Sequence, residues 1–310
     1  VIEKLANENK IEINEEGLTN VLNELNGLVG LDSVKGEIKS LVDLVRLQIR
    51  LQNSGQGFNF PSLNFAFVGN PGTGKTTVAR LLGSIFAHLG ILSRGQMIEV
   101  SRGSLVAGYV GQTAIKTRGQ IDRALDGVLF VDEAYALSRS GQLDGGSDFG
   151  AEAIEQLLLA MENERDRMSF IFAGYTEKMT DLLNSNPGLK SRVSNVIEFP
   201  DYTNEELVKV FNLFLKENGY SLDPSAMPVL IGYFRSLERN QSFGNARSAR
   251  GLFEAMQRTH ATRVASTLDE ATVELNVFVE EDLLNAVEFT KSAEIGGVIR
   301  LIGYREGTIF

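Results

Sequence analysis

The feature that most constrains this chain is the run Gly69-Asn-Pro-Gly-Thr-Gly-Lys-Thr76, which fits the phosphate-binding pattern G-x-x-x-x-G-K-[ST]. Residues 63–68 before it form an apolar run typical of a buried strand. Between residues 78 and 89, apolar side chains recur at helical spacing. A strand, a glycine-rich loop and a helix are the context that this pattern requires. An ordinary glycine turn is the alternative, but the fixed positions and both flanks favour a nucleoside triphosphate site.

The residue types in this loop predict how a triphosphate is held. Backbone N–H groups of the loop and of the following helix N-terminus can cradle the β- and γ-phosphates. Lys75 adds a positive charge, and the Thr76 hydroxyl is a predicted ligand of Mg²⁺. The predicted nucleotide contacts in this loop are Asn70, Pro71, Gly72, Thr73, Gly74, Lys75, Thr76 and Thr77.

A second apolar run ends in two acids. Residues 128–131 are all apolar and are followed directly by Asp132 and Glu133. A buried strand that delivers carboxylates at its C-terminal end suits a magnesium triphosphate site. We expect Asp132 to complete the Mg²⁺ shell with Thr76, and Glu133 to orient and polarise the attacking water. A strand that ends at two solvated acids is the alternative, which loses weight beside a phosphate loop.

Strand and helix signals alternate from residue 63 to residue 199, which predicts a parallel sheet with helices on both faces. From Asn204 onward the strand signals disappear. Apolar periodicity then predicts helices at 205–217, 226–237, 246–264 and 280–289. The predicted fold class is therefore α/β, a phosphate-loop parallel sheet followed by a smaller all-α domain.

These signals also set the expected domain boundaries. The α/β domain is assigned to residues 27–201 and the helical domain to residues 202–291. Residues 1–26 are expected to form an N-terminal helical extension, because four of their apolar residues recur at helical spacing. Residues 292–310 form a C-terminal tail, and the pattern leaves open whether it is an added hairpin or an interaction segment.

Charge and composition limit the partners and the compartment. The formal net charge of −10 argues against a large non-specific footprint on nucleic acid. The chain has no cysteine, which suits a reducing compartment. No apolar run approaches the roughly 20 residues of a membrane span, and no signal peptide opens the chain. We therefore expect a cytoplasmic protein that does not insert into membranes.

Five short segments carry a more specific signal. In chain order they are Phe67-Val-Gly-Asn-Pro-Gly-Thr-Gly-Lys-Thr76, Tyr109-Val-Gly111, Gly127-Val-Leu-Phe-Val-Asp-Glu-Ala-Tyr135, Asn186-Pro-Gly-Leu-Lys-Ser-Arg192 and Phe243-Gly-Asn-Ala-Arg247. Together they resemble the CbxX/CfqX family of AAA+ ATPases, which includes red-type Rubisco activases, the stage V sporulation protein K group and ATPases associated with type VII secretion. The resemblance covers roughly residues 27–265. It implies an AAA+ domain with a helical lid and an ATP hydrolase that uses ATP and Mg²⁺.

The resemblance also implies contacts with the base and with a neighbouring subunit. Val29 and Gly30 match the segment that contacts adenine in the family, although an ordinary helix lead-in has the same residues. Arg192 matches the arginine finger, which reaches the γ-phosphate held by the adjacent subunit. A guanidinium suits that role because it offers a fixed fork of donors to phosphate oxygens. Lys190 is a nearby rival for the same role.

Two further roles follow from the resemblance. Arg247 matches the sensor of the lid, which contacts the nucleotide within the same subunit, and Arg250 one turn later is the alternative. At the end of the fourth strand many AAA+ proteins carry Asn or Thr, which helps to orient water. This chain has Tyr175 at that position and Thr176 beside it, so the identity of the first sensor stays open.

Tyr109, Val110 and Gly111 bear on function beyond hydrolysis, because they resemble the central-pore loop of AAA+ protein remodelers. An aromatic ring can grip an extended peptide through apolar contact, whatever the peptide's sequence. The implied assembly is a homo-oligomer, a hexamer, that remodels or partially threads a protein client, whose identity the sequence does not reveal. An ATP-gated assembly scaffold and a clamp-loader-like nucleic-acid machine are the alternatives.

Overall fold

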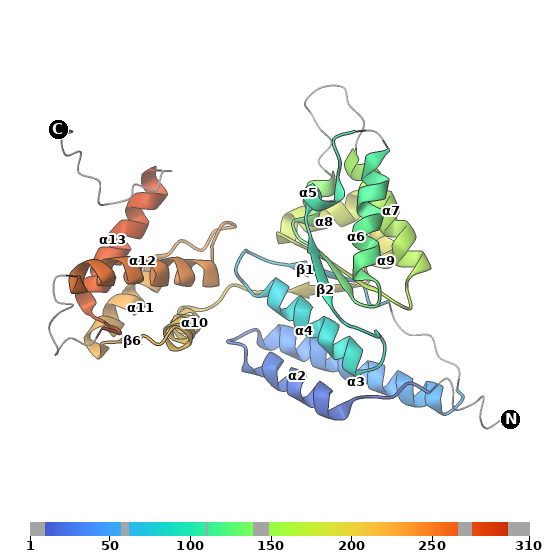
Figure 1. Ribbon diagram of the computed structural model, residues 1–310, viewed down its shortest axis with the longest axis horizontal. Coiled ribbons are helices and arrows are strands. Elements are labelled where there is room, and N and C mark those ends of the chain that lie inside the picture. Colours follow the sequence, from blue (N-terminus) through green and yellow to red (C-terminus); the bar gives the residue numbers. More distant parts are fainter. Residues whose placement is uncertain (1–9, 57–61, 110, 139–148, 266–274, 297–310) are drawn as a thin grey trace. The chain divides into compact units, whose positions relative to one another are not determined.

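The computed structural model describes residues 10–56, 62–109, 111–138, 149–265 and 275–296, and Figure 1 draws its elements. The chain divides into two compact units, with the boundary between Asp201 and Tyr202. Among the described residues, no helix combines the length and the apolar character that a membrane crossing needs.

The first unit is built on a five-stranded sheet in the order β2-β3-β4-β1-β5. Every neighbouring pair is parallel, so the carboxyl ends of all the strands lie at one edge. The strands are β1 (Phe65–Val68), β2 (Met97–Val100), β3 (Val128–Val131), β4 (Ser169–Gly174) and β5 (Asn195–Glu198). Every residue of β1, β3 and β4 is buried, as expected for central strands that helices cover on both faces.

Helices lie on both faces of this sheet, as Figure 1 shows. They are α2 (Glu15–Gly27), α3 (Asp32–Asn53), α4 (Lys75–His88), α5 (Arg102–Leu105), α6 (Gln112–Ala124), α7 (Phe149–Asn163), α8 (Thr176–Ser185), α9 (Pro187–Arg192) and the 3₁₀ helix η1 (Ala134–Ser138). Helices α3 and α4 cover one face, whereas α6, α7 and α8 pack on the other. The predicted α/β sheet is confirmed.

Two local features of the first unit were not predicted from the sequence. Helix α2, in the predicted N-terminal extension, packs against α4 within the first unit, and the Asn14 N–H donates to the carbonyl of His88 over 2.8 Å. The two segments lie close together at Gly17, where an added Cβ would lie 2.4 Å from the His88 ring and would displace it. Between β2 and the loop of Tyr109, the chain also forms the four-residue helix α5.

The second unit is helical around an aromatic core. Its helices are α10 (Asn204–Glu217), η2 (Pro224–Ala226), α11 (Met227–Ser236), α12 (Ala246–Val264) and α13 (Glu280–Gly296). Helix α10 begins with a capping box between Thr203 and Glu206. The rings of Phe211 and Phe253 pack edge-to-face 6.2 Å apart, and burial of such rings supplies much of the core's stability. The predicted helical unit after the sheet is confirmed.

This unit also contains a pair of strands that the sequence did not signal. Strands β6 (Ser221–Leu222) and β7 (Val277–Phe278) run parallel and have two residues each, too few to produce an alternating pattern. Helix α13 extends beyond the predicted 280–289, so residues 292–296 of the expected tail are helical. The remainder of that tail, 297–310, lies outside the described residues.

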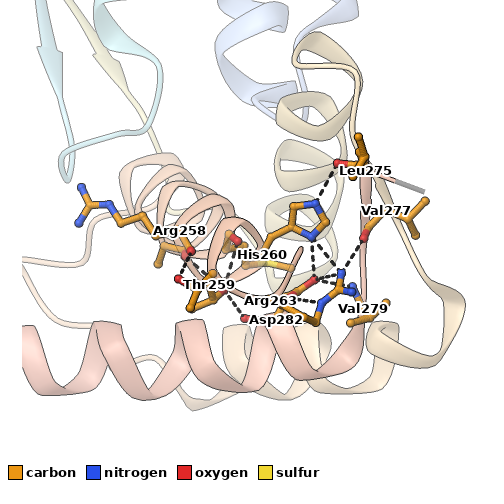
Figure 2. A network of polar contacts seen from close by, with 11 residues as sticks. Arg258, Thr259, His260, Arg263, Leu275, Val277, Val279 and Asp282 are labelled. Carbon is orange, nitrogen blue, oxygen red and sulfur yellow. Dashed lines mark hydrogen bonds and ion pairs between the residues drawn. The ribbon is translucent and has the colours of Figure 1, made fainter. Parts of the chain in front are cut away.

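A buried polar network joins α12 to α13 and β7, and Figure 2 shows it from close by. The Asp282 carboxylate, 1% exposed, accepts hydrogen bonds from Arg263 at 2.8 and 2.9 Å and from the Val279 N–H at 3.0 Å. His260 Nδ1 lies 3.1 Å from the same carboxylate, and its Nε2 lies 2.9 Å from the Leu275 carbonyl. Burial raises the pKa of Asp282, but the bonds from Arg263, Val279 and His260 outweigh it and leave that pKa below its ordinary value.

Candidate nucleotide-binding site

The carboxyl edge of the sheet gathers the residues that the sequence singled out. Gly69 follows β1, Asp132 follows β3 and Tyr175 follows β4. The Gly69 N–H donates to the carbonyl of Gly174, and the Asp132 N–H donates to that of Val100, so both turns begin in register with the strands beside them. Since β4 separates β1 from β3, the loop and the acids leave the edge roughly 10 Å apart, which is two strand spacings.

The phosphate loop has a backbone that requires glycine. Gly69 has φ +145°, and a Cβ there would lie 2.3 Å from the carbonyl oxygen of Phe199. Gly74, with φ +95°, is the N-cap of α4 and makes no side-chain cap bond to the helix. The first N–H groups of any α-helix have no acceptor within the helix, and glycine supplies no capping side chain here, an arrangement that suits an anion. The other predicted contacts belong to this loop and this turn: Pro71, Gly72, Thr76 and Thr77.

The loop is held closed by its own side chains. Lys75 Nζ donates to the carbonyl oxygens of Gly69 and Asn70 over 2.9 and 2.7 Å. The buried Thr73 hydroxyl donates to the carbonyl of Asn70 over 2.8 Å. The Asn70 side-chain amide reaches both carboxylate oxygens of Asp201, each over 3.0 Å. The ammonium group therefore lies inside the turn, where phosphate oxygens can replace the carbonyls as its partners.

The acidic pair turns sharply out of β3. Glu133 has φ +48°, a left-handed conformation that costs a non-glycine residue about 1–3 kcal/mol. Its N–H donates to the Asp132 carboxylate over 2.9 Å, and its carbonyl accepts from the Ala136 N–H in η1. Asp132 is half-buried and Glu133 is exposed, so the strained turn directs the second acid toward solvent at the sheet edge.

The segment expected to contact adenine is also bent by positive φ angles. Gly30 has φ +58° and the buried Leu31 has φ +60°, immediately before α3 begins. Lys35 Nζ donates to the carbonyl of Leu28 over 2.6 Å and closes this turn. Val29 and Gly30 are half-buried. Their contact with adenine stays a prediction.

Tyr175, the position of the first sensor in the resemblance, engages neighbouring side chains. Its ring centroid lies 5.9 Å from that of Tyr135, and Lys178 Nζ lies within 4.8 Å of both centroids. An ammonium at that distance from two rings is attracted to both of them. Thr176 is exposed at the start of α8, so the choice between these two residues stays open.

Arg192 lies at the surface of the first unit, at the end of α9. Its Nη2 donates to the Glu162 carboxylate over 3.1 Å, and its Nη1 donates to the Gly188 carbonyl over 3.4 Å. The side chains of Arg192 and Glu162 are 35% and 59% exposed. An ion pair so accessible to water stabilises by at most about 1 kcal/mol, so the guanidinium can exchange its partner at little cost. The rival Lys190 donates to Asn184 over 3.0 Å.

In the second unit, the two candidate sensor arginines have different surroundings. Arg247 is exposed in the first turn of α12, and within the described part of the chain its side chain makes no hydrogen bond or ion pair. The guanidinium of Arg250 lies 5.2 Å from the ring centroid of Phe214. Asn245, buried at φ +50° directly before α12, accepts the Tyr202 N–H through its side-chain oxygen over 2.8 Å. Arg247 is therefore the more available of the two.

The loop expected to face a client projects from the first unit. Tyr109 is 74% exposed, and Gly111 at φ +77° is the N-cap of α6. The Ala107 N–H donates to the Thr113 hydroxyl over 3.1 Å, which closes the base of the loop. Val110, the third predicted residue, lies outside the described residues. The exposed Tyr109 ring therefore belongs to a loop whose base is closed by a hydrogen bond.

Sequence reasoning missed two residues that the structure brings to this region. Asp201 holds Asn70 of the phosphate loop, and Arg102 donates to the carbonyl of Ala136 in η1. Both follow within three residues of a strand, so their place at the carboxyl edge was readable in principle. The hydrogen-bond partners of Asp201 and Arg102 could not be predicted, because no sequence motif indicates either pairing.

Comparison with known proteins adds independent findings. The profile described as "ATPase family associated with various cellular activities (AAA)" matches residues 65–201, and the profile of an AAA lid domain matches residues 203–293. The chain is 42% identical over 257 residues to the chloroplastic ribulose bisphosphate carboxylase/oxygenase activase of Cyanidioschyzon merolae, covering 83% of this chain and 87% of that protein. It is 40% identical over 278 residues to protein CbbX of Cereibacter sphaeroides, covering 88% and 89%.

A solved structure shows the same fold at lower identity. The FIGL-1 AAA domain in complex with ADP superposes with a TM-score of 0.59 at 19% identity, covering 91% of this chain and 87% of that one. At this identity the likeness shows the fold alone.

Proposed function

The chain belongs to the AAA family of ATPases, in the group of the CbbX and CfxQ proteins, and we propose that it couples ATP hydrolysis to the remodeling of a protein client. The observation that carries the proposal is Tyr109, which is 74% exposed. It is the one aromatic residue among the exposed large hydrophobic side chains of the described chain. Because the Tyr109 ring is exposed to solvent on a hydrogen-bonded loop, it can bury apolar area against a polypeptide.

The residues present fit Mg²⁺-ATP. Gly69 can approach the Phe199 carbonyl at its positive φ only because it lacks a Cβ, and the first turn of α4 points backbone N–H groups out of the helix end, where an anion binds. Thr76 and Asp132 would hold the Mg²⁺, which neutralises charge on the phosphate oxygens when it is bound. Val29 and Gly30 would contact the adenine.

Glu133 orients the water that attacks the γ-phosphorus and accepts its proton, while the bond from that phosphorus to the β–γ bridging oxygen breaks. The products are ADP and phosphate. Lys75 and the loop N–H groups stabilise the charge on the phosphate oxygens. Tyr175 or Thr176 would help to position the water. Arg247 would contact the nucleotide, so that the helical unit responds to the presence of the γ-phosphate.

Arg192 supports a shared site. It is partly exposed and paired only weakly with Glu162, so it is available to the phosphates of a neighbouring subunit. We propose that the chain forms a closed homo-oligomeric ring, a hexamer, in which each finger completes the next site. Hydrolysis would then require assembly, and the Tyr109 loops of all subunits would surround the client.

The test uses ribulose bisphosphate carboxylase/oxygenase as the client, because the name of one relative identifies that relative as its activase. Wild type, Tyr109→Ala and Tyr109→Phe are incubated with inhibitor-bound ribulose bisphosphate carboxylase/oxygenase and ATP, and the recovery of carboxylation is followed. The ring-retaining Phe variant should act like wild type, and the Ala variant should hydrolyse ATP without reactivating the carboxylase.

Three outcomes would contradict the proposal or narrow it. Undiminished remodeling by Tyr109→Ala removes the role of the loop. ATP-dependent assembly with turnover that no polypeptide alters indicates a scaffold. ATPase activity that DNA stimulates, and that falls steeply with salt, indicates a nucleic-acid machine. The net charge of −10 makes this last result unexpected.

A further inference from the structure

Arg102 holds the turn that follows the acidic pair. It begins α5 directly after β2, and its Nη1 donates to the carbonyl of Ala136 over 2.7 Å and to that of Leu137 at 3.5 Å. Both carbonyls belong to η1, which starts immediately after Glu133, and the Ala136 N–H bonds back to the Glu133 carbonyl over 2.8 Å. A cation at these carbonyls lies where the C-terminal end of a short helix favours positive charge.

On its other side, α5 is joined to the base of the Tyr109 loop. Lys116 Nζ donates to the carbonyl oxygens of Gly103 and Val106 over 2.7 and 2.9 Å. The buried Thr117 hydroxyl donates to the Leu105 carbonyl over 3.1 Å. Helix α5 and the first turns of α6 are therefore fixed to each other, with the exposed loop between them.

The contact of Arg102 is tightly enclosed. A Cβ at Gly150, in the first turn of α7, would lie 2.1 Å from the Leu137 carbonyl oxygen and 2.7 Å from Arg102 Nη1. No side chain fits there unless the carbonyl or the guanidinium moves. Contacts packed this closely do not deform gradually, so a displacement of η1 is passed to α5 rather than absorbed.

We propose that Arg102 is a positioning residue that transmits the state of the Asp132–Glu133 turn to the Tyr109 loop. The inference rests on the proposed function, because it assumes that the loop responds to nucleotide. The route is contiguous: from the Glu133 carbonyl through η1 to the guanidinium, then through α5 to α6. Contiguity alone does not demonstrate coupling, so the test measures coupling directly.

The chain has no cysteine, so one introduced thiol can be labelled selectively. An environment-sensitive dye on Gln112→Cys, at the exposed start of α6, reports the loop when ATP or ADP is added with Mg²⁺. The same label is placed in Arg102→Met and in the conservative Arg102→Lys. A matched control is Arg123→Met, an exposed arginine of α6 whose Nη1 donates to Gln120. Binding of a fluorescent ATP analogue is measured in parallel.

Arg102→Met should lose at least about five-fold of the nucleotide-dependent dye signal, since allosteric couplings are typically of this size or larger. Its affinity for the analogue should change less than about two-fold, Arg102→Lys should recover part of the signal, and Arg123→Met should keep it. If Arg102→Met does not fold, Gly150→Ala tests the same contact without removing the charge and should also reduce the signal.

A full signal in folded Arg102→Met or in Gly150→Ala overturns the inference. A parallel loss of signal and of nucleotide affinity overturns it as well, because that pattern indicates a purely structural role. Absence of any nucleotide-dependent signal in the parent protein contradicts the proposed function itself.

Discussion

At the scale of single residues, the site combines groups that sequence can identify with contacts that it cannot. Lys75 and Thr76 stand at fixed positions of a motif whose chemistry determines the residue type. The left-handed turn at Glu133 has no such signature, and neither has the pairing of Arg192 with Glu162, which joins residues 30 positions apart. Glutamate carries no local signal for a positive φ, so the strain was not predictable.

Replacement of Glu133 separates binding from chemistry. Glu133→Gln keeps the size and polarity of the side chain but cannot accept a proton, so we expect kcat to fall by about 10²–10⁴-fold with ATP affinity nearly unchanged. Steady-state phosphate release and equilibrium binding of ATP measure the two quantities. Glu155→Gln, an exposed acid of α7, is the control and should match wild type. A similar loss in both variants would remove Glu133 from the mechanism.

Arg192 gives a second test at this scale. Arg192→Ala should retain ATP binding and lose about 10³-fold or more in kcat, as expected when a finger arginine is removed. The control is Lys190→Ala, two residues away on the same short helix, which should remain active. If the roles are exchanged, with the lysine variant inactive and the arginine variant active, Lys190 is the finger.

At the scale of elements, apolar patterns were sufficient wherever a segment is long or fully buried. The apolar runs at 63–68 and 128–131 located β1 and β3 closely, and the periodicity of residues 246–264 located α12. The four-residue helix α5 and the strands β6 and β7 were not predicted, because no periodicity can show in so few residues. Tertiary contacts, such as the bonds of Arg102 and Lys116, stabilise α5 instead.

The network between α12 and α13 predicts how the helical unit responds to acid. The folded-state pKa of Asp282 is lowered, so folding favours the ionised carboxylate. The resulting stability is fully present above the ordinary carboxyl pKa of about 3.9, and it is lost as the pH falls through the lower folded-state value. Hydrogen exchange of α12 and α13 peptides between pH 5 and pH 2 should show protection falling in that window.

Asp282→Asn tests the same network at neutral pH. The variant removes the charge of the carboxylate that accepts hydrogen bonds from Arg263 and the Val279 N–H, and the local free energy of unfolding should drop by about 3 kcal/mol. The control, Glu280→Gln, removes an exposed charge from the same helix start and should cost no more than about 1 kcal/mol. Unchanged exchange in Asp282→Asn would show that the network contributes little to stability.

At the scale of the whole molecule, the proposed active site belongs to two chains. The phosphate loop and the acidic pair lie in one protomer, whereas Arg192 would come from the next. From the sequence, a site shared between two protomers could be proposed only through the family resemblance, because the residues of one chain do not indicate which groups a neighbouring chain supplies.

A mixing experiment examines that division. Glu133→Gln and Arg192→Ala are expected to be inactive alone, but together they should form sites that combine an intact acid with an intact finger. Random 1:1 assembly into closed rings gives one half times one half, about one quarter of the sites. ATPase activity of the mixture should therefore approach about one quarter of wild type. A mixture as inactive as its parents would argue against sharing in trans.

The bond between Asn70 and Asp201 has a consequence for how the chain can be altered. Asp201 is the last residue of the first unit. Its carboxylate accepts hydrogen bonds from Asn70 in the proposed phosphate loop. The end of the first unit is therefore tied by hydrogen bonds to the proposed phosphate loop. We expect that an insertion or a fused tag at this junction would disturb phosphate binding as directly as a substitution at one of the loop glycines.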